Sequence, residues 1–298
     1  MDIQWYPGHM TRAKRQMQED LKLVDMIIEL VDARVPLSGR NPDIQQMGNG
    51  KGRLLILTKS DLADEAGTKA WIAYYRSLGM QVLAADTRQK ASLKRIRPLA
   101  EAACREKRER DAKRGIRNRT IRAMVCGIPN VGKSTFINSL AGKSMAKTGD
   151  KPGVTRGKQW IHLSGGLDLM DTPGILWPKF DDPEAGEKLA MIGSISNNVY
   201  EDEELAWQII HFLRTRYPGA LADRYHIEET SDLKDAELLA EIARKRGFIV
   251  KGGEVSTERA AGVLSDEFRS GKLGRFTLDQ VRSNCCQEPD NQKQNTRK

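Results

Sequence analysis

The residues best suited to chemistry form the segment Gly127-Ile-Pro-Asn-Val-Gly132-Lys133-Ser134, which fits the pattern G-x-x-x-x-G-K-[ST]. An apolar run, Ile121–Cys126, precedes this segment, and residues with helical spacing follow it, as around a true phosphate-binding loop. Glycine allows backbone N–H groups to turn toward a phosphate at the amino end of a helix. The loop predicts a nucleoside triphosphate site, with contacts from Asn130, Val131, Gly132, Lys133, Ser134 and Thr135.

Two downstream segments could complete a phosphate and metal site. Asp171-Thr-Pro-Gly174 ends an apolar run, and Pro152-Gly-Val-Thr155 lies between it and the phosphate-binding loop. We expect Lys133 to reach the β- and γ-phosphates and the Gly174 N–H to meet the γ-phosphate. Hydroxyl and carboxylate oxygens suit Mg²⁺, and its expected ligands are Ser134, Thr155 and Asp171, the last through water.

A third segment, Thr58-Lys-Ser-Asp61, could select the base, because it fits the pattern [NT]-K-x-D. The Asp61 carboxylate can accept hydrogen bonds from the guanine N1–H and amino group, which adenine cannot supply together. The Lys59 stem can lie along the base. Thr58 stands where asparagine is usual, so an amide that could tie the base to the phosphate loop is lost. Guanine contacts are expected from Thr58, Lys59 and Asp61.

These motifs occur in an unusual order, because the base-binding segment precedes the phosphate loop and ordinarily follows it. Opening an ordinary GTPase domain between the Asp171 loop and the strand Met26–Val31, and joining its original ends, would produce this order. The basic segment Arg105–Arg122 would then be the new connection. The loop Ala84–Thr87 lacks the usual Ser-Ala pattern, so no base contact is expected from it. The order indicates a circularly permuted GTPase.

Six short apolar runs predict the strands that position these motifs. Helical spacing separates most of them, at Glu65–Leu78, Leu93–Arg110 and Lys133–Leu140. Alternation of this kind predicts an α/β fold with a six-stranded, mostly parallel sheet. The expected strands are Met26–Val31, Arg53–Thr58, Gln81–Ala85, Ile121–Cys126, Gln159–Leu163 and Leu167–Met170.

The pattern changes beyond about residue 179, where only helical spacing remains. Helices are expected over Asp202–Arg216, Leu233–Arg246 and Thr257–Ser270, and Gly247 and Gly271 follow the last two as stop residues. We expect a GTPase domain over residues 1–178 and a small all-α domain over residues 179–284. Residues 285–298 are expected to be a disordered tail, because no hydrophobic residue follows position 286.

The charge is positive and unevenly spread. Lys and Arg number 49 against 40 Asp and Glu, which gives a formal net charge of +9. Arg105–Arg122 carries nine basic and three acidic residues, and a smaller basic cluster spans residues 12–15. A solvated helix face or a linker could explain either run alone. Together they favour an anionic polymer, most commonly nucleic acid, as a partner.

Several classes of protein are disfavoured. No stretch approaches the ~20 apolar residues of a membrane helix, and the amino-terminal residues lack the apolar core of a signal peptide. The four cysteines form no C-x-x-C pair, so neither a disulfide framework nor a zinc site is expected. We expect a reduced, cytoplasmic protein with no membrane partner.

The sequence resembles the circularly permuted GTPases, and most closely the ribosome biogenesis GTPase A (RbgA, also called YlqF) family. Besides the motifs above, the resemblance depends on Trp5-Tyr-Pro-Gly-His-Met10 and Asp32-Ala-Arg-Val-Pro-Leu-Ser-Gly-Arg-Asn-Pro42. It implies binding of GTP and GDP, late maturation of the large ribosomal subunit on a precursor particle, and an RNA-binding helical domain.

Two residues are candidates for assisting hydrolysis. Ile175 stands where many GTPases place a water-orienting glutamine, so another side chain must take that role. His9, in an expected Pro-Gly turn, can exchange a hydrogen bond near neutral pH, and the resemblance also points to this histidine. Its segment precedes the strand Met26–Val31, which we expect to lie next to the strand that ends at Asp171 in the sheet. Asn130 lies in a loop of the form G-x-P-N-V-G-K-S, as in GTPases whose loop asparagine helps to hold K⁺ near the transferred phosphate. The alternative is that Asn130 serves only to shape the loop.

Other functions remain open at this point. A tRNA-modifying or signalling GTPase would share the nucleotide motifs, and a nucleotide-regulated RNA-binding protein would need hydrolysis only incidentally. The permuted order and the segment Trp5–Met10 favour a GTP-hydrolysing assembly factor for the large ribosomal subunit.

Overall fold

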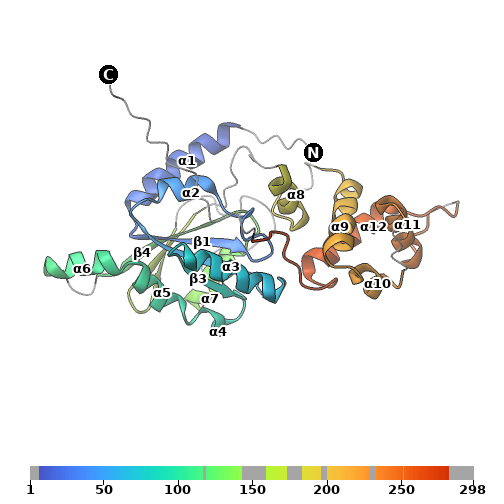
Figure 1. Cartoon of the computed structure of the whole chain (residues 1–298). Helices are drawn as coiled ribbons and strands as arrows, with labels where there is room; N and C mark the ends of the chain where they lie inside the picture. Colours follow the sequence, from blue (N-terminus) through green and yellow to red (C-terminus); the bar gives the residue numbers. More distant parts are fainter. Residues whose placement is uncertain are drawn as a thin grey trace, which may run out of the picture.

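The computed structural model describes residues 7–116, 119–142, 159–172, 183–195, 200–227, 233–250 and 252–281. A six-stranded sheet in the order β3-β2-β1-β4-β6-β5 forms its centre (Figure 1). Only the β5–β6 pair is antiparallel among the neighbouring strands described. The predicted α/β fold is confirmed. The strands are β1 (Met26–Asp32), β2 (Gly52–Thr58), β3 (Gln81–Ala85), β4 (Ile121–Gly127), β5 (Gln159–Leu163) and β6 (Leu167–Asp171).

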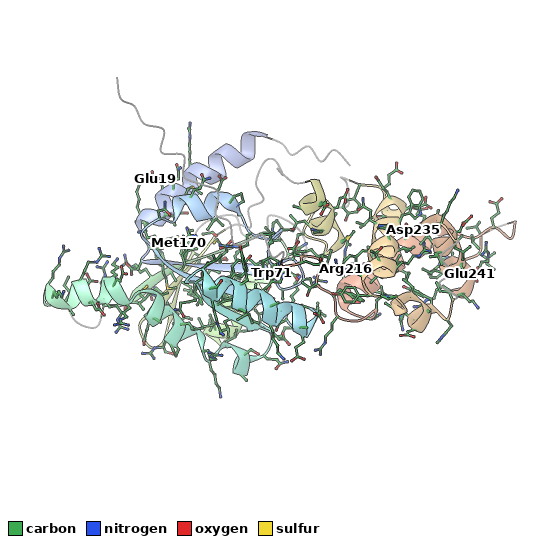
Figure 2. The ribbon with its side chains drawn as sticks, viewed as in Figure 1. Glu19, Trp71, Met170, Arg216, Asp235 and Glu241 are labelled. Atoms are coloured by element: carbon green, nitrogen blue, oxygen red, sulfur yellow. The ribbon has the colours of Figure 1, made fainter. Side chains whose placement is uncertain are left out.

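Helices cover both faces of the sheet, which explains why its strands read as continuous apolar runs. Ile27 and Val31 of β1 face the layer of α1 (Pro7–Lys22), α2 (Pro42–Met47) and α3 (Glu65–Ser77). Ile28 and Leu30 alternate with them and face α5 (Ile96–Ala103) and α7 (Lys133–Ala141). Trp71 of α3, labelled in Figure 2, is fully buried against the first face.

The single helix expected over Leu93–Arg110 is wrong, because the chain forms three shorter helices there. They are α4 (Lys90–Leu93), α5 and α6 (Arg105–Lys113). Pro98 lies in the first turn of α5, where its missing N–H has no intrahelical partner to lose. A continuous helix would place the ring of Pro98 against the carbonyl of Lys94, so the chain turns between α4 and α5.

The strand order corrects a second expectation. Strand Met26–Val31 was expected to lie beside the strand that ends at Asp171, but β4 lies between β1 and β6 and pairs with both. The loop at Asp171 is therefore two strands away from the end of β1. The carboxyl ends of β1, β2, β4 and β6 nevertheless lie along one edge of the sheet, since these strands are parallel.

The second half is helical, as predicted. It contains α8 (Pro183–Met191), α9 (Asp202–Arg216), α10 (Ala220–Tyr225), α11 (Asp235–Lys245) and α12 (Thr257–Ser270). Leu213, Ile242 and Leu264 are buried in the core between α9, α11 and α12. Gly247 and Gly271 have φ values of +67° and +78°, which confirms the two predicted helix stops.

The chain returns to the sheet after α12. The ring of Phe276 stacks on the ring of Phe268, with centroids 5.4 Å apart. The backbone N–H of Phe276 donates to the Leu62 carbonyl at 3.2 Å. The Leu278 N–H donates to the Arg34 carbonyl at 2.7 Å. The helical region is therefore joined to loops at the carboxyl edge of the sheet. Within the described ranges, no helix is long and apolar enough to cross a membrane.

Candidate functional site

The phosphate-binding loop lies at the carboxyl edge of the sheet, between β4 and α7. A Cβ at Gly127 would lie 2.7 Å from the Leu30 carbonyl oxygen, so only glycine fits where β4 passes β1. Asn130 and Gly132 have φ values of +59° and +94°, and this left-handed backbone turns the chain into α7. The strand–loop–helix context predicted for this motif is confirmed.

Lys133 and Asp171 form an ion pair at the base of the loop. Both side chains are buried, and Thr172, directly after Asp171, donates to the Val125 carbonyl at 2.8 Å. Such a pair leaves little uncompensated charge in the site. A phosphate that binds Lys133 would release the Asp171 carboxylate, so nucleotide binding and exposure of this acid are chemically linked.

Thr58 supplies a connection that the sequence had suggested was lost. Its hydroxyl donates to the Val131 carbonyl of the phosphate loop at 2.8 Å and lies 3.3 Å from the Val31 carbonyl. Thr58 is fully buried at the end of β2. The threonine hydroxyl thus ties the base-binding strand to the phosphate loop directly, although the amide of the usual asparagine is absent.

Asp32, at the end of β1, is a buried carboxylate that forms an ion pair with Lys59 of the base-binding segment. Arg34 donates from Nε and Nη2 to its two oxygens at 2.9 and 2.8 Å, and Lys59 Nζ lies 3.1 Å away. Burial alone would raise the pKa of Asp32, but Arg34 and Lys59 outweigh it and hold the pKa well below the ordinary value. Lys59, with φ of +51°, is therefore held by its side chain as well as its backbone.

Asp61, predicted to bind the base, is partly exposed and pairs with a residue that the sequence did not single out. Arg88 Nη2 lies 2.6 Å from Asp61 Oδ2, and Arg88 Nε donates to Asp86 at 3.0 Å. Hydrogen bonds from Arg88, with its charge, lower the pKa of Asp86. The loop Ala84–Thr87 is thus joined through Arg88 to Asp61 of the predicted base-binding segment, although it lacks the usual Ser-Ala pattern.

Asn130 connects the phosphate loop to the helical region. Its side-chain nitrogen donates to the carbonyl of Gly193, two residues after the end of α8, at 2.8 Å. Arg269, near the end of α12, donates to the carbonyls of Ala190 and Met191 at 2.9 and 3.1 Å. These three hydrogen bonds fix the end of α8 between the phosphate loop and α12.

Arg269 is also joined to the base side of the site. Its carbonyl accepts a hydrogen bond from Arg34 Nη1 at 3.0 Å, and Arg34 holds Asp32, which in turn holds Lys59. The base-binding segment and the phosphate loop therefore reach the same residue of α12 by separate routes.

The residues at this edge fit a magnesium ion. Ser134 lies half-buried in the first turn of α7, and Asp171 ends β6, whose partner strand β4 leads directly into the phosphate loop. A hydroxyl and a carboxylate are the hard oxygen ligands that Mg²⁺ prefers, and phosphate oxygens would complete the set. Thr135 lies beside Ser134 and is also half-buried, with its N–H at the amino end of α7.

Three predicted site residues are not placed as fully. Thr155 and Gly174 lie outside the described residues. The backbone of His9 lies in the first turn of α1, so the expected free Pro-Gly turn is wrong at this position, and its side chain lies outside what the structure describes. Since α1 leads into β1, the helix that carries His9 is attached to a central strand of the sheet.

A phosphate loop and a guanine-type motif at one sheet edge, with the motif earlier in the chain, define a circularly permuted phosphate-loop GTPase. Residues 122–245 match the family described as 50S ribosome-binding GTPase, and residues 45–180 match the RsgA GTPase family. The chain is 43% identical to the ribosome biogenesis GTPase A of Bacillus cereus, over 94% of each chain. It belongs to the ribosome biogenesis GTPase A family and hydrolyses GTP.

More distant relatives and solved structures agree with this assignment. The mitochondrial ribosome-associated GTPase 1 of Xenopus tropicalis is 34% identical, over 92% of this chain and 94% of that one. The GDP-bound structure of YlqF from Thermotoga maritima has a TM-score of 0.64 at 27% identity, and covers 89% of this chain and 99% of that chain.

The sequence missed Arg34, Arg88 and Arg269 as parts of the site. Arg34 lies in the segment Asp32–Pro42, which carries part of the family resemblance, and this was the one signal in the sequence that could have pointed to it. An arginine two residues after the end of β1 and another after β3 are visible in the sequence, but their partners are set by strand order. Arg269 gave no signal, because it reaches the site from another region of the fold.

Proposed function

We propose that this GTPase binds a precursor of the large ribosomal subunit, promotes its late maturation and leaves when GTP is hydrolysed. The observation that carries the proposal is 43–44% identity, over 94% of the chain, to proteins named ribosome biogenesis GTPase A. The net charge of +9 suits a particle rich in RNA. Such a particle places the protein in the cytoplasm of a bacterium.

The link between hydrolysis and release would pass through the helical region. Asn130 and Arg34 touch opposite sides of the nucleotide site, and both connect to the end of α12 through described hydrogen bonds. In the sequence, residues 175–182 lead from Gly174 directly to α8; they lie outside the described residues and would add a third connection. A γ-phosphate that shifts the phosphate loop would thus alter how the helical, RNA-binding region sits on the sheet.

The roles of individual groups in hydrolysis belong to this proposal. Lys133, with the N–H groups from Asn130 to Thr135, would hold the phosphates, and Thr58, Lys59 and Asp61 would hold guanine. Ser134, Thr155 and Asp171 would bind Mg²⁺, the Gly174 N–H would meet the γ-phosphate, and His9 would orient the attacking water. These assignments put charge, base choice and water on separate elements.

We also propose that K⁺ binds beside Asn130, in addition to Mg²⁺. Asn130 uses its side-chain nitrogen on Gly193, so its side-chain oxygen is the atom that would meet K⁺. A monovalent cation there would supply positive charge near the transferred phosphate. We expect faster GTP turnover in K⁺ than in Na⁺ at equal ionic strength, and equal rates would contradict this role.

Co-sedimentation with purified large-subunit precursors tests the main proposal. Binding is measured with GDP, with GTP and with a non-hydrolysable GTP analogue, at several salt concentrations. We expect tight binding with the analogue, weaker binding with GDP and a steep loss with salt. Identical affinity with GDP and the analogue would contradict release by hydrolysis, and no binding in any state would contradict the ribosomal partner.

A further inference from the structure

A basic surface lies at the amino edge of the sheet, opposite the nucleotide site. Two adjoining cavities of about 260 and 330 Å³ open where β1, β2 and β4 begin. Five cations line the larger one, with only two carboxylates, Asp25 and Asp111. We call this set the amino-edge surface: Lys51, Lys107, Arg110, Arg114 and Arg119.

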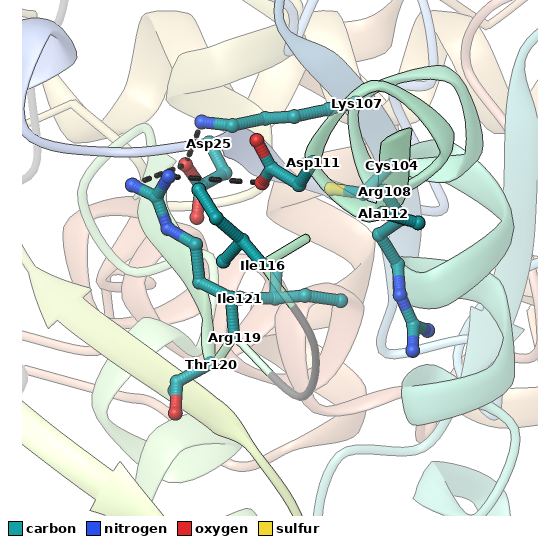
Figure 3. A pocket seen from close by; sticks show the side chains of 10 residues that line it. All are labelled: Asp25, Cys104, Lys107, Arg108, Asp111, Ala112, Ile116, Arg119, Thr120 and Ile121. Atoms are coloured by element: carbon teal, nitrogen blue, oxygen red, sulfur yellow. Dashed lines mark hydrogen bonds and ion pairs between the residues drawn. The ribbon is translucent and has the colours of Figure 1, made fainter. Parts of the chain in front are cut away.

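One buried carboxylate, Asp25, holds two of these cations beside the cavities. The side chain of Asp25, directly before β1, is 7% exposed and pairs with Lys107. It also accepts the Arg122 N–H at 2.9 Å, and Arg119 Nη2 lies 3.9 Å away. Figure 3 shows Lys107 and Arg119 converging on Asp25, with Arg119 also facing Asp111 at 3.6 Å. Two cations are thereby held at the cavity by a group that water barely reaches.

Lys51 donates from Nζ to the Val24 carbonyl at 2.7 Å, whereas the two remaining cations are not used by the fold. Arg110 and Arg114 make no hydrogen bond or ion pair through their side chains with any residue that the structure describes. Helix α6, which carries Arg110, buries none of its side chains and projects from the sheet domain at the end away from the helical region (Figure 1). Burial of its side chains therefore does not explain why this helix is basic.

We propose that the amino-edge surface binds the sugar–phosphate backbone of RNA. Arginine presents a planar set of donors that matches phosphate oxygens, and three of the five cations are arginines. An acidic protein would need an apolar centre to its interface, whereas Ile116 is the exposed large apolar residue described here. The inference rests on the proposed function, because a ribosomal particle offers this backbone.

Binding at this surface would not depend on the nucleotide. β1 has seven residues, so its two ends are about 20 Å apart. Among the described residues, no hydrogen bond or ion pair joins the amino-edge surface to the phosphate loop. The surface would contribute to affinity in both nucleotide states, while the helical region would supply the difference between them.

The test replaces two cations that hold nothing in the fold, in the variant R110A/R114A. The probe is deproteinised large-subunit ribosomal RNA, titrated over a range of salt concentrations with GDP and with a GTP analogue. We expect affinity to fall equally with both nucleotides, and the slope of log affinity against log salt to become shallower by about 1.4 to 1.8. GTP turnover of the free protein should be unchanged, because neither residue lies near the nucleotide site.

The matched control is K69A/R76A, which removes two exposed cations from α3. Loss of RNA affinity equal to that of this control would overturn the proposal. A loss seen with intact particles but not with deproteinised RNA would assign the surface to a ribosomal protein instead. Failure of the parent protein to bind precursor particles, with the RNA result intact, would contradict the proposed function alone.

Discussion

The two edges of the sheet carry charge in different ways. At the carboxyl edge, Lys133 pairs with Asp171, and Arg34 and Lys59 pair with Asp32, largely away from water. At the amino edge, one buried carboxylate, Asp25, pairs with Lys107 beside a cavity whose outer arginines face solvent. Both edges are rich in cations, but among the described residues the amino edge leaves Arg110 and Arg114 without a carboxylate partner.

This difference indicates what each edge can do. A compensated pair must exchange partners when a phosphate arrives, so its geometry changes with the ligand. An uncompensated, exposed cation attracts any polyanion and has no partner to release. The carboxyl edge is therefore suited to a switch, and the amino edge to attachment. Four substitutions test this contrast, beginning with the largest expected effect.

His9 gives the largest effect, since it is proposed to act on the water rather than on the nucleotide. We expect His9→Ala to lower GTP turnover about 10²–10⁴-fold, because general acid–base or orienting groups contribute on that scale. Affinity for GTP should stay nearly unchanged. Single-turnover hydrolysis, with and without ribosomal particles, and a nucleotide titration measure the two quantities separately.

A coupled loss of GTP binding and turnover would make His9 structural, since α1 packs against the sheet. The control is Gln16→Ala, on the same helix, whose side chain makes a hydrogen bond to Asp20. This substitution should leave turnover near the parent value. Full turnover in His9→Ala with ribosomal particles would remove the histidine from the mechanism.

Arg34 tests the compensated charge at the carboxyl edge. Arg34→Ala leaves Asp32 fully buried with Lys59 as its remaining partner, and removal of one member of a buried pair costs about 3–5 kcal/mol. We expect a drop of this size in the free energy of unfolding, measured in urea at pH 7. The control Arg105→Ala, in an exposed pair with Glu109, should change it by less than about 1 kcal/mol.

The effect of pH on this loss follows from the lowered pKa of Asp32. A carboxyl group with a lowered pKa in the folded state stabilises the fold above its ordinary value of 3.8, and this contribution is lost as pH falls below that value. The difference between parent and Arg34→Ala should therefore be constant near neutral pH and shrink in acid, because Asp32 takes up its proton at a higher pH in the variant than in the parent. A difference that grows in acid would contradict this account of Asp32.

The local chemistry of the site could be predicted from the sequence better than its connections. The phosphate loop and the base segment each follow a strand that the apolar runs predicted, since both depend on neighbours in the chain. Strand order was not predictable in full, and β1 was placed beside the wrong strand. The contacts of Arg269 with Met191 and with Arg34 join residues 78 and 235 positions apart, and no short pattern in the sequence predicts them.

Asp61 tests base choice at the carboxyl edge, with a smaller effect. Replacement by asparagine removes the charge that would accept hydrogen bonds from guanine, worth about 1.5–3 kcal/mol. We expect Asp61→Asn to lose about 10- to 150-fold in preference for GTP over ATP, measured by competition. Asp86→Asn, in the same ion-pair group, should keep the preference. Equal competition by ATP in the parent protein would contradict the assignment of Thr58–Asp61.

Arg88 gives the smallest effect, and its direction is opposite. Its guanidinium occupies the Asp61 carboxylate, so guanine must displace it. The arginine side chain is 66% exposed, and exposed ion pairs contribute about 0.2–1 kcal/mol. We expect Arg88→Ala to bind GDP and GTP up to about five-fold more tightly, without a change in base preference. The gain should fade at high salt, because exposed charges are screened.

The control Arg97→Ala, in an exposed pair with Glu101, should bind nucleotide like the parent. Weaker binding in Arg88→Ala would instead show that the arginine contacts the nucleotide, and the carboxyl edge would then attract ligand with an exposed cation, as the amino edge is proposed to do.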